Sequence, residues 1–257
     1  MPPPQPPQDQ PPTLEHDPSL EAFNIPVQDW LAANPEHQLI VSAIVSLPSS
    51  FPSFNPNQPR PQPPQEDDEK EERTLLLQRA PTDQDPLTWE HPGGGCNPHE
   101  TLLQAVAREL AEETGLVARR VAGLVTTLDI PEPGFDEVKR GRGVRGWWRL
   151  FCFLVEIQVE VEGEVEGGVE NGGEGEGDGG GDGVGGLLPL PVVRLDPEEH
   201  CAYVWATEGE VRRGECGGVE MRWDGEGNMR KGVILRGFEV LRERRALARG
   251  RGVMGGV

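Results

Sequence analysis

A glycine-rich turn that runs into a short acidic helix, residues 93–116, constrains this chain more than any other stretch. Three consecutive glycines, 93–95, indicate a tight turn where the backbone can approach a ligand closely. Thr101, with a glutamine three residues later, has the spacing of a capping box and predicts that a helix begins there. The run 97–100 offers a competing N-cap, so the first turn stays open. Gly115 predicts the end of the helix.

At about 100° per residue, the predicted helix has an apolar stripe beside an acidic one. The apolar stripe must face a core and consists of Leu103, Val106, Ala107 and Leu110. The acidic stripe, at positions i, i+3 and i+4, consists of Glu109, Glu112 and Glu113. Carboxylates this close repel one another at neutral pH and, as hard oxygen ligands, suit Mg²⁺ or Mn²⁺. Arg108, one turn before Glu112, partly offsets their charge.

The ordinary explanation for a run of glutamates is a solvated helix face. The spacing of the whole stretch, however, resembles the Nudix box: a glycine, five residues, Glu, seven residues, then Arg-Glu-apolar-x-Glu-Glu-x-Gly-apolar. Every defined position of the box is filled, by Gly94, Glu100, Arg108, Glu109, Leu110, Glu112, Glu113, Gly115 and Leu116. Residues 89–94 also look like the strand and turn that precede the box in that family.

The resemblance to the Nudix hydrolase family implies an α/β fold, an α/β/α sandwich with a mixed β-sheet. It implies a Mg²⁺-dependent (or Mn²⁺-dependent) hydrolase of phosphorus-containing acid anhydrides, which cleaves a diphosphate linkage in a nucleoside diphosphate linked to another moiety. The implied metal ligands are Glu109, Glu112, Glu113 and the carbonyl oxygen of Gly94. The implied catalytic residues are Glu109, Glu112 and Arg108, which orients the carboxylates. Which glutamate acts as the general base differs among relatives and stays open.

Two other classes of protein stay open as well. A non-catalytic Nudix-fold sensor would bind a nucleotide without turnover, but binding alone does not require all three metal carboxylates, which are present. A scaffold would bind partners through proline-rich and acidic segments, but the proline-rich run lacks a clean repeated P-x-x-P array. Asn97 stands where many relatives have an acidic residue, while the box positions remain intact. The enzyme is therefore favoured, without a choice of substrate.

Family members often bring a further carboxylate from outside the box. Four glutamates are open candidates, with helix-starting acids as the ordinary explanation: Glu198, Glu199, Glu208 and Glu210. His200 is a candidate catalytic residue, although a single histidine beside a strand is more often structural. Cys96 is a candidate reactive thiol, but such a cysteine is more often a small residue that fits a turn.

A basic loop, residues 130–146, is either solvated or a mobile arm that meets substrate phosphates. Its cations are Lys139, Arg140, Arg142 and Arg145. Trp147 or Trp148, which follow it, can stack on a nucleobase. Core packing is expected for at least one of the two.

The remaining pattern predicts alternating elements. Strands are expected at 38–47, 73–79, 121–129, 147–161 and 201–207, and a closing helix at 230–249. Residues 23–31 predict an extended entry and a short helix that ends near Asn34 and Pro35. The first two strands would form a hairpin with an expanded loop. The closing helix has an apolar face of Ile234, Phe238 and Leu241. Such an order suggests a mixed sheet with helices on both faces.

Much of the composition does not belong to the fold. Residues 1–18 are proline-rich, 51–72 run from Pro, Asn and Gln into charge, and 162–186 are almost wholly Gly, Glu, Asp and Val. We expect these segments to be disordered, as well as the tail 250–257, which leaves one Nudix hydrolase domain at 19–249 with two insertions.

The charge and the cysteines limit the partners and the compartment. The net charge of −20 is mostly that of the insertions, and a chain this acidic lacks the basic surface of general nucleic-acid binding. The expected partner is a small nucleotide substrate, with no membrane partner, and the oligomeric state is not predictable. Four cysteines far apart, with no secretory signal or transmembrane stretch, indicate reduced thiols in a cytoplasmic or nuclear protein.

Overall fold

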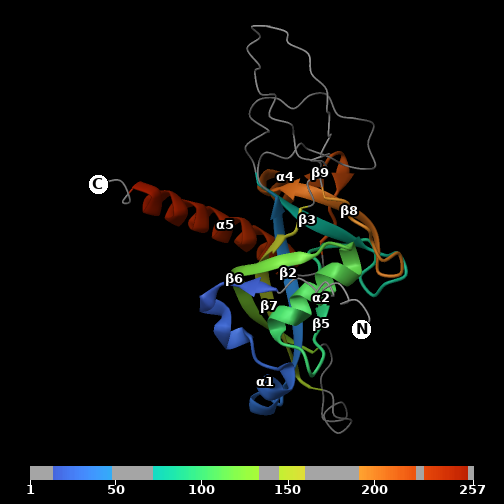
Figure 1. Ribbon diagram of the computed structural model, residues 1–257. Helices are drawn as coiled ribbons and strands as arrows, with labels where there is room; N and C mark the ends of the chain where they lie inside the picture. Colours follow the sequence, from blue (N-terminus) through green and yellow to red (C-terminus); the bar gives the residue numbers. More distant parts are fainter. Residues whose placement is uncertain (1–13, 48–71, 133–144, 160–190, 224–228, 254–257) are drawn as a thin grey trace, which may run out of the picture.

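The computed structural model describes residues 14–47, 72–132, 145–159, 191–223 and 229–253 (Figure 1). Nearly all of the segments expected to be disordered, and most of the basic loop, lie outside the described residues. The helices are η1 (Pro18–Phe23), α1 (Val27–Ala33), α2 (Leu102–Thr114), α4 (Glu208–Arg213) and α5 (Met229–Val253). The strands are β1 (Glu15–His16), β2 (His37–Leu47), β3 (Arg73–Arg79), β4 (Trp89–Glu90), β5 (Gly93–Gly95), β6 (Ala118–Pro131), β7 (Trp147–Ile157), β8 (His200–Thr207), β9 (Glu215–Cys216) and β10 (Val219–Glu220).

Eight of the described strands form one mixed sheet. Its order is β1-β6-β7-β2-β3-β4, with β5 paired to β2 and β8 paired to β3. The pairs β1–β6 and β2–β7 are parallel, and the other pairs in this sheet are antiparallel. The central strand β2 therefore carries β7 along one edge, while β5 and then β3 share the other edge.

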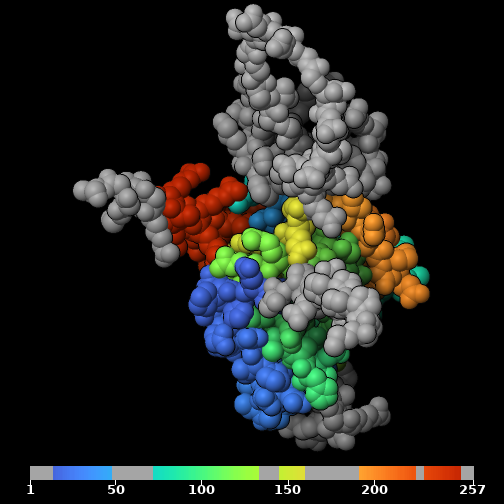
Figure 2. Space-filling view, in the orientation of Figure 1, coloured from blue at the N-terminus to red at the C-terminus, as the bar shows by residue number. Residues whose placement is uncertain are grey.

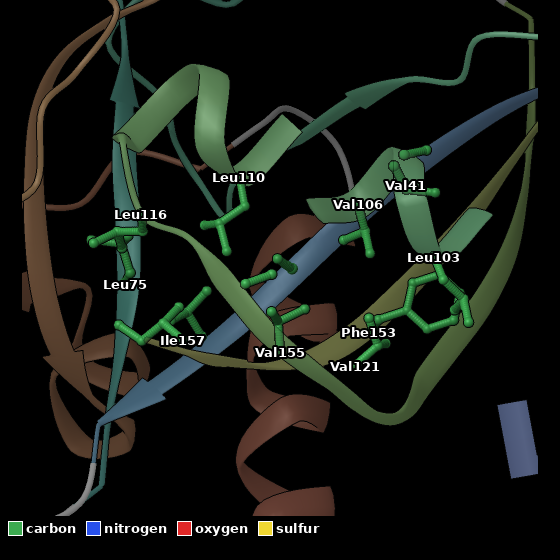
Figure 3. Close-up of a cluster of buried hydrophobic side chains, with 14 of the residues drawn as sticks. Val41, Leu75, Leu103, Val106, Leu110, Leu116, Val121, Phe153, Val155 and Ile157 are labelled. Carbon is green, nitrogen blue, oxygen red and sulfur yellow. The ribbon is translucent and has the colours of Figure 1, made fainter. Parts of the chain in front are cut away.

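The sheet is covered by helices on both faces, because side chains alternate along its central strands. Val41, Ala43 and Val45 of β2 belong to the core beneath α2, whereas Ile44 belongs to the core beneath α5. Figure 3 shows the first of these cores, where Leu103, Val106 and Leu110 of α2 face Phe153 and Val155 of β7. On the opposite face, the core contains the predicted face of the closing helix, Ile234, Phe238 and Leu241. The expected α/β/α sandwich is confirmed.

The predicted elements are found close to their expected bounds. The expected hairpin is present as an antiparallel pair that joins Ser46 to Thr74 and Leu47 to Arg73, beside the first insertion. Strand β6 is longer than expected, from Ala118 to Pro131, because it pairs with β7 along that length. Strand β7 ends at Ile157, earlier than residue 161.

Both ends of the fold extend past the domain limits expected at residues 19 and 249. At the start, Glu15 and His16 pair in parallel with β6, and Asp17 accepts a hydrogen bond from Ser19 N at 3.1 Å as the cap of η1. A two-residue polar strand that joins an edge leaves no hydrophobic pattern in the sequence. At the other end, α5 continues to Val253 and projects from the body of the domain (Figure 2). Among the described helices, none is long and apolar enough to cross a lipid bilayer.

Candidate metal and active site

The glycine turn is built against the central strand and beneath helix α2. Strand β5 pairs with β2 so that Gly93, Gly94 and Gly95 lie opposite Ser42, Val41 and Ile40. A Cβ atom at Gly93 would lie 2.2 Å from the carbonyl oxygen of Val41, so this position admits only glycine. A Cβ atom at Gly94 would lie 2.6 Å from Oε2 of Glu109. The glycines therefore bring the backbone of the turn directly against a carboxylate of α2.

Helix α2 begins and ends where the sequence predicts. Thr101 accepts a hydrogen bond from Gln104 N at 3.2 Å, and the side chain of Gln104 accepts one from Thr101 N at 2.9 Å, which completes the capping box. Gly115 closes the helix in the left-handed conformation, at φ 68°. These two caps fix the register of the acidic side chains between them.

Arg108 joins the box carboxylates to the glycine turn. Its guanidinium donates to both oxygens of Glu100, at 3.0 and 2.7 Å, and to the carbonyl of Gly95 at 2.8 Å. It also donates to Glu109 and to Glu112, each at 2.8 Å. Burial works to raise the pKa of Glu100, but the hydrogen bonds from Arg108 and from the backbone outweigh it and lower that pKa. The predicted proximity of Arg108 to the carboxylates is thus present.

The three glutamates of the predicted acidic stripe differ in environment. Glu112 is exposed, whereas Glu109 is 9% and Glu113 5% exposed. Burial raises the pKa of Glu113 to about 9; the N–H of Gly93 opposes that shift, and neighbouring carboxylates increase it. Those neighbours are Glu90, Glu109 and Glu199. Burial also raises the pKa of Glu109, against the effect of Arg108.

The start of strand β8 brings two further groups to Glu113. One ligand atom each of Glu113, Glu199 and His200 lie within 4.8 Å of one another. Among the four open carboxylates, Glu199 is therefore the one that the structure places at the box. Glu208 pairs instead with Arg212 and Arg242, and Glu210 caps its own helix and pairs with Arg73. Glu198 is exposed.

Glu90 is a site residue that the sequence analysis did not single out. It is buried, and its carboxylate accepts from Arg79 at 2.8 and 3.0 Å and faces Arg230 Nε at 3.3 Å and His200 Nε2 at 3.2 Å. Burial works to raise the pKa of Glu90, but His200 and the two guanidinium groups outweigh it and lower that pKa. Its partners lie 11, 140 and 110 positions away, so no local spacing reveals the cluster. In the sequence, the one feature that points to Glu90 is its position between Trp89 and the glycine turn.

The arrangement fits a divalent cation. Glu109, Glu113 and Glu199 offer hard oxygen ligands whose mutual repulsion is only partly offset, because Arg108, within the described part of the chain, pairs with Glu109 but with neither of the other two. The backbone of Gly94 also lies against the carboxylate of Glu109. Glu112 stands apart on the exposed side and reaches the group through Arg108.

The other side chains considered from the sequence are two tryptophans, the basic loop and Cys96. Trp148 is half-buried and donates through its indole N–H to Glu132, whereas Trp147 is 43% exposed. Arg145 donates to the carbonyl oxygen of His37, and the other three cations of the basic loop lie outside the described residues. Burial and the nearby carboxylates raise the pKa of the Cys96 thiol to about 12, which favours the unreactive interpretation.

Comparison with known proteins agrees with this geometry. The family model of the NUDIX domain matches residues 66–177, which include the glycine turn, α2 and strands β6 and β7. The RNA pyrophosphohydrolase of Caulobacter vibrioides is 39% identical over 64 residues, which are 24% of this chain and 37% of that protein.

Solved structures resemble the chain more distantly. The NUDIX domain of Shewanella oneidensis NrtR in complex with ADP ribose aligns with 84% of this chain and 99% of its own, at 16% identity and a TM-score of 0.44. An Ap4A hydrolase of C. elegans aligns with 80% of this chain and 98% of its own, at 14% identity and a TM-score of 0.43. The complete box and the family match together define the class of domain: residues 66–177 match the NUDIX domain.

Proposed function

We propose that this protein is a divalent-cation-dependent hydrolase that cleaves a diphosphate linkage in a nucleoside diphosphate linked to another moiety, with Mg²⁺ or Mn²⁺ as the cation. The observation that carries the proposal is the buried carboxylate of Glu113, set beside Glu109 and Glu199 with too little positive charge around it. Ionised carboxylates this close repel one another unless a cation binds between them. A diphosphate substrate brings further negative charge to the same place.

Each residue has a role in this proposal that follows from its position. Glu113, Glu109 and Glu199 hold the cation, together with the carbonyl of Gly94. A bound cation neutralises phosphate charge and makes water a better nucleophile. Arg108 fixes the glycine turn and the carboxylates of Glu109 and Glu112 in one geometry through its five hydrogen bonds. Glu109 or Glu112 accepts a proton from the attacking water, and the choice between them stays open.

The substrate is proposed as a class only. The matched relatives are named for RNA pyrophosphate chemistry and for Ap4A, and one was solved with ADP ribose. These compounds share a chain of phosphates attached to a nucleoside. The matched region spans 37% of the length of the curated relative, so a particular substrate is not carried over from it.

The test measures phosphate-containing products from a panel of nucleoside diphosphate derivatives, with Mg²⁺ or Mn²⁺ added. We expect metal-dependent cleavage of at least one compound. Glu113→Gln removes a ligand of the cation, and Glu112→Gln removes a candidate base that Arg108 holds, so each should lower turnover by about 100-fold or more. Glu198→Gln, an exposed glutamate that pairs with no site residue, is the matched control and should keep wild-type turnover. No cleavage across the panel, with tight nucleotide binding by the folded chain, would favour the sensor instead.

A further inference from the structure

His200 is a buried histidine whose two ring nitrogens have different surroundings. Its side chain is 3% exposed, and it begins strand β8 directly after Glu199. Nε2 lies 3.2 Å from a carboxylate oxygen of Glu90. Nδ1 is buried and has no hydrogen-bond partner among the described residues. A buried polar atom without a partner is unusual and calls for a ligand.

The partners of Glu90 determine which nitrogen of His200 carries the proton. Arg79 and Arg230 hold the Glu90 carboxylate between two guanidinium groups, which keeps it ionised. An ionised carboxylate only accepts hydrogen bonds, so Nε2 must be the donor. In the neutral imidazole, Nδ1 then has a free lone pair. A metal ion binds to histidine through such a lone pair.

The ring of His200 lies next to the proposed cation site. A ring nitrogen of His200 and one oxygen each of Glu113 and Glu199 lie within 4.8 Å of one another. Two ligands on opposite sides of a cation bound at about 2.1 Å are about 4.2 Å apart, so small side-chain movements suffice for all three to share one ion. The carboxylate of Glu90 behind the ring completes the arrangement by which proteins commonly orient a metal-binding histidine.

We propose that Nδ1 of His200 is a nitrogen ligand of the cation held by Glu113 and Glu199, and that Glu90 is the positioning residue that orients it. The inference rests on the proposed function and makes it more specific. Imidazole favours first-row transition metals over Mg²⁺, whereas a set of oxygens alone suits Mg²⁺. The site is therefore selective for a cation such as Mn²⁺ over Mg²⁺, and the selectivity lies in a residue outside the box.

The direct test is pulsed electron paramagnetic resonance of the full chain loaded with one equivalent of Mn²⁺. A directly bound imidazole gives a ¹⁴N hyperfine coupling, and carboxylates do not. We expect this coupling in the wild type and its loss in His200→Gln, whose amide keeps a donor for Glu90 but has no ring nitrogen. His99→Gln, an exposed histidine in the box loop, is the matched control and should keep the coupling.

A second measurement does not depend on turnover. Titration calorimetry should show that His200→Gln weakens Mn²⁺ binding by about 10–100-fold and Mg²⁺ binding by less than about 3-fold. Circular dichroism shows whether the variant is folded. If it is not, the presence or absence of the ¹⁴N coupling in the wild-type protein decides the assignment of His200. Mn²⁺ bound without nitrogen coupling, in a wild type that still cleaves its substrate, would overturn the histidine assignment and leave the hydrolase standing. A chain that binds no Mn²⁺ would overturn both.

Discussion

Glu90 and Glu113 are two buried carboxylates in one electrostatic neighbourhood, and the protein treats them in opposite ways. They are exposed to 8% and 5%, so burial works to raise the pKa of both. The pKa of Glu90 is nevertheless lowered, because His200, Arg230 and Arg79 surround it. The pKa of Glu113 rises to about 9 through burial, because its one stabilising hydrogen bond comes from the N–H of Gly93 and the charges that act on it are those of carboxylates.

The difference indicates that Glu90 supports the fold, whereas Glu113 is available to bind a cation. Glu90 is neutralised by groups from β3, β8 and α5, which tie three distant parts of the chain together. Glu113 lies on a helix whose own arginine, Arg108, turns towards Glu100, Glu109 and Glu112 instead. Among the described residues, therefore, no arginine or lysine forms an ion pair with Glu113. A carboxylate that the fold buries without a counter-ion is where an external cation belongs.

The largest expected effect on stability comes from replacing each of these two glutamates by glutamine. Glu90→Gln removes the buried anion that Arg79 and Arg230 share, which leaves them, among the described residues, only Asp83 and Asp85 as acidic partners, and should lower the free energy of unfolding by about 3 kcal/mol. Glu113→Gln, in metal-free protein, removes a carboxyl group that must take up a proton to be buried at this pH, and should raise that free energy. Urea denaturation at pH 7.5 with a chelator measures both. Equal losses of unfolding free energy in the two variants would show that the fold depends on both carboxylates in the same way.

Added cation should act through Glu113. At a Mn²⁺ concentration 100 times its dissociation constant, binding to the folded state alone stabilises it by about 2.7 kcal/mol. Most of this gain should disappear in Glu113→Gln and persist in Glu198→Gln. Thermal unfolding with and without Mn²⁺ at pH 8 measures the gain in each variant. A gain of the same size in Glu113→Gln would place the cation elsewhere.

The pH dependence of stability should have opposite signs for the two groups. Between the ordinary pKa of 4.5 and about 9, folded Glu113 keeps a proton that the unfolded chain releases, so metal-free stability falls as pH rises through this window. The slope from this one group is at most about 1.4 kcal/mol per pH unit. Glu90, with a lowered pKa, contributes stability that is present above 4.5 and is lost as pH falls through its folded pKa.

Variants separate this slope from the general repulsion of an acidic chain. Glu113→Gln should flatten the fall in melting temperature between pH 5 and pH 9, while Glu112→Gln, which removes an exposed charge from the same helix, should not. Calorimetric scans in chelator at several pH values give the comparison. Parallel slopes in the two variants would assign the effect to net charge instead of the buried site.

The two regions also differ in how far the sequence predicts them. The box helix, its caps and its acidic stripe follow from spacings within 24 residues, because capping and helical periodicity are local. The cluster around Glu90 depends on pairings between β3, β4, β8 and α5, and no local pattern carries that information. For the same reason four glutamates had equal claims as the extra carboxylate until β8 placed Glu199 beside Glu113. The short strand β1 was missed since its two residues are polar.

The smallest expected effect on stability concerns Glu109, which lies between the two kinds of environment. In Gly94→Ala the new methyl group would lie 2.6 Å from Oε2 of Glu109, so that carboxylate must move. Because a flexible side chain can move at a cost of about 1 kcal/mol, the fold should survive. Turnover should nevertheless fall by about 100-fold, as misplacement of a catalytic group by an ångström commonly does.

The matched control for that variant is the next residue. A methyl group at Gly95 meets no atom within 4 Å, so Gly95→Ala should keep wild-type turnover and stability. Steady-state kinetics on the substrate found in the panel, with melting temperatures of both variants, distinguishes a displaced carboxylate from a damaged turn. If both alanines reduced turnover equally, the flexibility of the glycine turn would matter more than the position of Glu109. If only Gly94→Ala did so, the contact between the turn and Glu109 would be a requirement of the site.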